Sequence, residues 1–164
     1  MPSVRAALDC PKPLLKNVKG IVYRRPSDKG VPVNVPTAIH PVRDCLAVPR
    51  FPSFEAILGL DAELHETWVS CPDALGRPCR FLVAAQYHPG HEDNRALKRI
   101  LPEIAWKGDL VVMRGGTAYF IVNMGDATHR ELAERAVRKF LLETAPIVAH
   151  AAEHNIPLLI PTAM

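Results

Sequence analysis

The chain has 164 residues, of which 48% are hydrophobic and 23% are charged. This balance is typical of a folded globular protein and excludes a disordered or fibrous chain. The length suits one domain, and a formal net charge of +3 is too small to indicate a nucleic-acid-binding protein by itself.

The positive charge is concentrated at the start of the chain. Residues 1–30 contain seven Lys and Arg side chains and two carboxylates, whereas the remainder contains 13 basic and 15 acidic side chains. Nine of the 16 prolines fall within residues 1–52, and proline lacks the amide that a helix interior or a central strand requires. We therefore expect residues 1–36 to form a basic, Pro-rich extended arm, with one short strand at Gly20–Arg24.

The rest of the chain, residues 37–164, has the patterns of one folded domain. Two hairpins are expected, one from the alternating runs Glu66–Cys71 and Cys79–Tyr87, and one around the glycine pair at residues 115 and 116. A brief helix that begins at Ser53 should end at Gly59. Further elements are expected at residues 44–48 (strand), 92–101 (helix, with the acids at 92 and 93 at its start) and 156–160 (edge strand).

The strongest helix signal follows residue 127. Thr128 and Glu131 have the spacing of a capping box, and an apolar stripe then recurs at helical intervals. Pro146 should kink or end this helix, and Asn155 should close a second helical stretch. The expected fold is α+β: one antiparallel sheet of four to five strands, with two to three helices on one face, preceded by the Pro-rich basic arm.

Two groups of side chains have the residue types of zinc ligands. His150, Glu153 and His154 form an H-x-x-E-H string that resembles the inverted zinc-protease motif, although no third ligand follows it. The second group comprises Cys71, Cys79, His88 and His91, whose cysteines are further apart than in usual zinc knuckles. Buried thiols and solvent-facing histidines are the alternative interpretation, so a zinc-dependent enzyme or zinc-stabilised domain is a minority hypothesis.

The basic arm is the main candidate for a binding segment. Its residues Lys16, Lys19, Arg24, Arg25 and Lys29 flank Tyr23, which offers phosphate contacts and one stacking ring for nucleic acid. An extended arm of this kind can instead pair with a partner protein or with a second copy of the chain. Trp68 and Trp106 are of the type enriched at such interfaces.

The leading hypothesis is a non-catalytic protein-interaction or regulatory module, whose partner is another protein or a second copy of the chain. The reason is that the sequence contains no nucleophile motif and no phosphate-loop motif. Nucleic-acid binding through the arm is the first alternative, and zinc the second. Without a secretory signal or a long apolar run, the expected location is cytoplasmic or nuclear, with no membrane partner. The four cysteines are then expected to be thiols.

The segment from Trp106 to Arg114, together with Asn94–Leu97, resembles small uncharacterised proteins of basidiomycete fungi. The resemblance covers about a third of the chain and implies no function.

Overall fold

The structure, a computed structural model, describes residues 14–41, 47–116, 120–125 and 127–158. Its strands are β1 (Leu15–Tyr23), β2 (Val31–Pro41), β3 (Ala47–Pro52), β4 (Leu64–Pro72), β5 (Pro78–Gln86), β6 (Leu110–Gly115) and β7 (Ile121–Val122). Its helices are α2 (Glu55–Leu58), α3 (Arg95–Ile100), α4 (Ala127–Glu143) and α5 (Ala145–Glu153).

All strands belong to one antiparallel sheet. The order is β3-β2-β1-β6-β5-β4, and β7 pairs with β6 in a seven-stranded sheet. The protein is therefore α+β, but the prediction of four to five strands and two to three helices is wrong, since the described part of the chain has seven strands and four helices. The difference arises mainly from β1 and β2, which lie in the segment that was expected to be an arm.

The prediction that an extended arm precedes the sheet is wrong for residues 15–36. β1 lies between β2 and β6, and its Val18, Ile21 and Val22 side chains are at most 5% exposed. Prolines 32 and 36 are tolerated in β2 because their even spacing puts both missing amides on one side of the strand. That side faces away from β1, and β3 pairs with β2 only from Thr37 onward, so no ladder hydrogen bond is lost.

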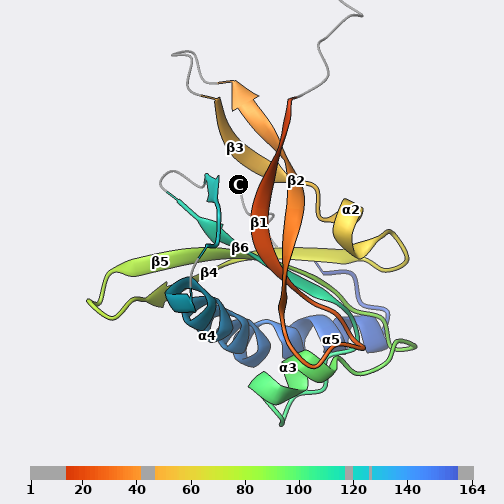
Figure 1. The fold of residues 1–164 in the computed structure, drawn as a ribbon. Helices are drawn as coiled ribbons and strands as arrows, with labels where there is room; N and C mark the ends of the chain where they lie inside the picture. The colour runs from red at the N-terminus through yellow and green to blue at the C-terminus, as the bar shows by residue number, and fades with distance from the viewer. Residues whose placement is uncertain (1–13, 42–46, 117–119, 126, 159–164) are drawn as a thin grey trace, which may run out of the picture.

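The sheet is strongly curled (Figure 1), and buried side chains form a cluster on each of its faces. β1 and β2 run steeply across β4 and β5, and α3, α4 and α5 lie together on one side of the sheet. On that side, Val83 and Val112 share a cluster with Leu97 of α3 and Phe140 of α4. On the opposite face, Leu58 of α2 packs with strand residues, so helices cover both faces rather than one.

Several local predictions are confirmed. The β4–β5 hairpin pairs Cys71 with Cys79 around the expected turn. Gly59 ends α2 with a φ of 79°, and Asn155, with a φ of 52°, follows α5 in the left-handed region. Pro146 occupies the first turn of α5, where proline costs no helical hydrogen bond.

Other boundaries differ from the prediction. α4 already includes Thr128, so the capping box does not start the helix. The second hairpin is shorter than expected, because β7 has only two residues. Residues 156–158 form no strand, and the rest of that expected strand lies outside the described residues, as does most of the one at 44–48.

Candidate functional site

The turn between β1 and β2 is fixed to the start of α3 by a buried asparagine. Asn94 is 1% exposed, and its side-chain amide donates hydrogen bonds to the carbonyl oxygens of Tyr23 and Gly108, both at 2.8 Å. Its side-chain oxygen accepts a hydrogen bond from the Leu97 amide at 3.0 Å and so caps α3. The residues at 92 and 93, which were expected to start the helix, precede it.

Two further contacts hold the same turn against its surroundings. The Asp109 carboxylate accepts from the Arg25 backbone amide at 2.8 Å and from the Arg25 guanidinium at 3.3 Å. The Arg99 guanidinium donates to the backbone oxygen of Asp28 at 3.1 Å. The relative position of the turn and α3 is therefore set by side chains from three separate segments.

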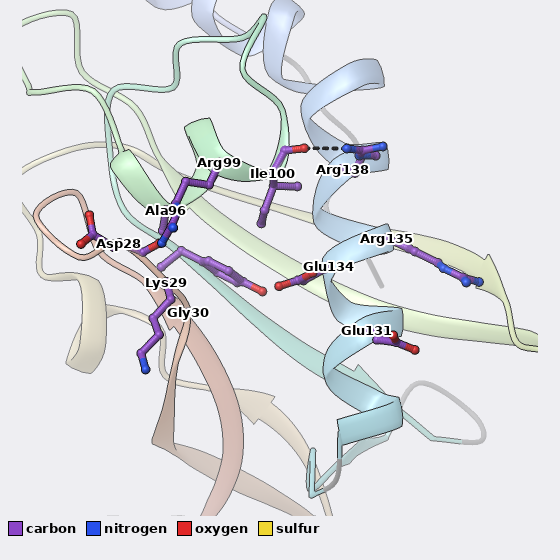
Figure 2. Close-up of a pocket in the computed structure, with 11 residues that line it drawn as sticks. Asp28, Lys29, Gly30, Ala96, Arg99, Ile100, Glu131, Glu134, Arg135 and Arg138 are labelled. Atoms are coloured by element: carbon purple, nitrogen blue, oxygen red, sulfur yellow. Dashed lines mark hydrogen bonds between the residues drawn. The ribbon is translucent and has the colours of Figure 1, made fainter.

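A cleft of about 480 Å³ opens between this turn, α3 and α4. We call it the charged cleft. Its lining residues are Tyr23, Asp28, Lys29, Gly30, Ala96, Arg99, Ile100, Glu131, Glu134, Arg135 and Arg138. In Figure 2, Glu134 points from α4 toward the turn, whereas Arg135 points away from it.

The charged side chains of the cleft are held apart. The Arg138 guanidinium donates to the backbone oxygen of Ile100 at 2.8 Å (Figure 2), and Arg99 is bound to a backbone oxygen as described above. Within the described ranges, no lining cation of the cleft lies within ion-pair distance of a carboxylate. Their charges therefore remain available to a ligand.

A second hollow of about 400 Å³ adjoins the cleft, with which it shares Asp28 and Arg99, and is also lined by Arg95 and Lys98. Together the two hollows gather six cations and three carboxylates. The excess of three positive charges in the two hollows is as large as the +3 formal net charge of the whole chain. We call Lys29, Arg95, Lys98 and Arg99, which come from the turn and α3, the basic rim.

The tyrosine at the base of the charged cleft is almost fully buried. Tyr23 is 2% exposed. Burial raises the pKa of its hydroxyl far above the usual value, the nearby Glu134 carboxylate raises it further, and Arg130 acts in the opposite direction. The hydroxyl is therefore neutral over the physiological range and can donate or accept a hydrogen bond.

The structure distributes the predicted arm residues over different environments. Lys16 and Lys19 are exposed on the first part of β1, whereas Tyr23 and Lys29 line the charged cleft. Arg25 is bound to Asp109, and Arg24 donates to the Ile57 backbone oxygen at 3.3 Å. The predicted residues therefore form no single patch, and burial of the Tyr23 ring removes it as a stacking surface.

The two cysteines and two histidines predicted as zinc ligands are not brought together. Cys71 and Cys79 face each other near the turn of the β4–β5 hairpin. His88 and His91 follow the opposite end of β5, and the strand from Cys79 to Gln86 spans roughly 23 Å at the rise of an extended strand. Their two rings lie 5.1 Å apart, and burial lowers the pKa of His91 below its usual value.

The H-x-x-E-H string is used for contacts within and beside α5. The rings of His150 and His154 lie 4.2 Å apart, and Glu153 accepts a hydrogen bond from the Tyr87 hydroxyl at 2.8 Å. Burial, followed by the effect of Glu153, raises the pKa of Tyr87 to about 12. Considering the described ranges alone, no three His, Cys, Asp or Glu side chains are grouped so that they could hold a metal ion. Zinc binding stays a prediction, which elemental analysis of the purified protein would test.

The sequence interpretation missed the cations and carboxylates of α3 and α4. The alternation of charge along α4 was visible, but a charged helix face is usually solvated. Trp106, which was considered for an interface, is 1% exposed and packs against Tyr87 and Phe140. Only the proximity of the β1–β2 turn to both helices identifies the cleft, and that proximity is not encoded in any local pattern.

Compared with protein families, characterised proteins and solved structures, the chain gives no significant match. Over the part of the chain that the structure describes, no helix is long and apolar enough to cross a membrane.

Proposed function

We propose that this protein is a non-catalytic interaction module that binds an acidic segment of a partner protein along the basic rim and the charged cleft. The observation that carries the proposal is the grouping of six cations with three carboxylates in two adjoining hollows. Complementary charge of this kind accelerates encounter and selects the partner.

The chemistry of the lining supports binding rather than covalent catalysis. Among the described residues that line the charged cleft, none is a Ser, Cys or His, which are common nucleophiles and bases in such reactions. Its volume of about 480 Å³ falls within the range of pockets that hold a small ligand or a few residues of a peptide.

The expected affinity is modest. An exposed ion pair contributes about 0.2–1 kcal/mol, so the four cations of the basic rim contribute at most about 4 kcal/mol together. This corresponds to binding in roughly the millimolar range unless further contacts form. The affinity should fall as salt is added, because exposed charges are screened.

A labelled peptide of nine glutamates tests the proposal by fluorescence anisotropy at low salt. The charge-reversed pair Lys29→Glu and Arg95→Glu should weaken binding at least tenfold, since it replaces two attractions by two repulsions. Both side chains are exposed or half-exposed and have no side-chain hydrogen bond or ion pair within the described ranges, so the fold should survive.

The matched control reverses Lys16 and Lys19, which are exposed on the first part of β1. It changes the net charge equally, and we expect binding to change less than twofold. Failure of the glutamate peptide to bind, or equal losses in both double variants, would contradict the proposal. Tighter binding of single-stranded oligo-thymidine with the same dependence on Lys29 and Arg95 would indicate a nucleic acid as the partner instead.

A further inference from the structure

The charged cleft contains a tyrosine hydroxyl that no described residue binds. Tyr23 is 2% exposed but lines the cleft. Its hydroxyl forms no hydrogen bond with any described residue. A hydroxyl can both donate and accept a hydrogen bond, so this unpartnered hydroxyl is a candidate contact for something that enters the cleft.

A carboxylate lies beside that hydroxyl. Glu134 points from α4 toward the β1–β2 turn (Figure 2), and its charge acts on Tyr23. Within the described segments Glu134 has no ion-pair partner. The nearby guanidinium groups of Arg99 and Arg138 donate to backbone oxygens instead.

We propose that Tyr23 and Glu134 form a subsite for a positively charged amine or guanidinium group carried by the acidic segment. This inference rests on the proposed function and specifies the ligand: carboxylates that contact the basic rim, interrupted by one Lys or Arg side chain that enters the cleft.

The hydrogen-bonding capacities of the groups match. An ammonium group has three donors and no acceptor, and it would find the Glu134 carboxylate and the Tyr23 hydroxyl oxygen as acceptors. A hydrogen bond between charged partners is stronger and shorter than one between neutral groups. A ligand carboxylate in the same place would instead be repelled by Glu134, so the subsite discriminates by charge.

Two labelled peptides test the inference. Each has four glutamates on either side of a central residue, which is lysine in one and norleucine in the other; the two side chains are similar in length, but only lysine carries a charge. The wild-type protein should bind the lysine peptide at least fivefold more tightly. Glu134→Gln should abolish this preference while the norleucine peptide still binds.

Glu131→Gln is the matched control, since Glu131 also lines the cleft and carries the same charge. It should retain most of the preference. Tyr23→Phe removes only the hydroxyl and should reduce the preference at least twofold, with circular dichroism to confirm that the variant is folded.

Each outcome decides a separate claim. Equal binding of both peptides to the wild-type protein would overturn the subsite but leave the proposed function intact. A preference that survives Glu134→Gln would also overturn it. Failure of every glutamate-rich peptide to bind would contradict the proposed function, and the subsite with it.

Discussion

Replacement of Asn94 by alanine should destabilise the protein by about 3 kcal/mol. The variant loses the cap of α3, which contributes about 1 kcal/mol. It also removes the donor to the backbone oxygens of Tyr23 and Gly108, and each buried carbonyl left unpaired costs about 1 kcal/mol or more. Since about 1 kcal/mol shifts the melting temperature of a domain of this size by 2–4 °C, a decrease of about 6–12 °C is expected.

Urea unfolding followed by tryptophan fluorescence, together with a thermal scan, measures this effect. Asn34→Ala is the matched control, because Asn34 is exposed on β2, and it should change stability by less than about 0.5 kcal/mol. Asn94→Asp keeps the side-chain oxygen that caps α3, but it replaces the donor nitrogen by an oxygen that faces both backbone carbonyls. It should therefore lower the free energy of unfolding at least as much as Asn94→Ala does. A loss below about 1 kcal/mol for Asn94→Ala, or wild-type stability of Asn94→Asp, would refute the reasoning.

Three further predictions concern the fold. Gly108→Ala should cost about 3 kcal/mol or more, because its Cβ would overlap the backbone oxygen of Gln86. Gly125→Ala should be nearly neutral in the same urea assay, since no atom of the described residues lies within 4 Å of its Cβ. Burial and a neighbouring carboxylate raise the pKa of Tyr87 to about 12, whereas an unfolded tyrosine ionises near pH 10, as a rough value. The unfolded chain therefore releases this proton first, and the free energy of unfolding should fall as the pH rises from about 10 to about 12. The decrease should be less steep in Tyr87→Phe, and an equal decrease in both proteins would contradict this prediction. Deletion of residues 1–30 removes β1 from the sheet, so the truncated chain should show no cooperative unfolding transition, whereas an intact transition would favour the arm hypothesis.

The sequence predicts this fold best where the signal is local. The β4–β5 hairpin follows from alternating polarity on either side of a turn rich in Pro and Gly. The end of α2 at Gly59 follows from the left-handed backbone that glycine adopts easily. These elements depend on the residues within them and on little else.

The prediction fails where distant segments determine the outcome. Pro32 and Pro36 argue against a central strand, but the register of β2 turns both missing amides away from β1, on a stretch of β2 that lies before its pairing with β3 begins at Thr37. The true cap of α3, Asn94, also serves two distant carbonyls. The contacts that join the turn, α3 and the start of β6 give Asn94 and Asp109 a structural role.

The charged cleft is a second example of a non-local feature. The basic residues of the first 30 positions suggested one binding arm, but the fold separates Lys16 and Lys19 from Lys29 along β1 and the following turn. Cations of α3 then join Lys29 to form the basic rim. A count of charges along the chain cannot show which of them converge in space.

The central claim is that acidic ligands bind at the cleft and the basic rim rather than along β1. Titration of the ¹⁵N-labelled protein with the peptide of nine glutamates, followed by amide chemical shifts, locates the contact directly. The account predicts the largest shifts at Lys29, Arg95 and Arg99. Shifts centred on Lys16 and Lys19, or small shifts spread evenly over the surface, would contradict it.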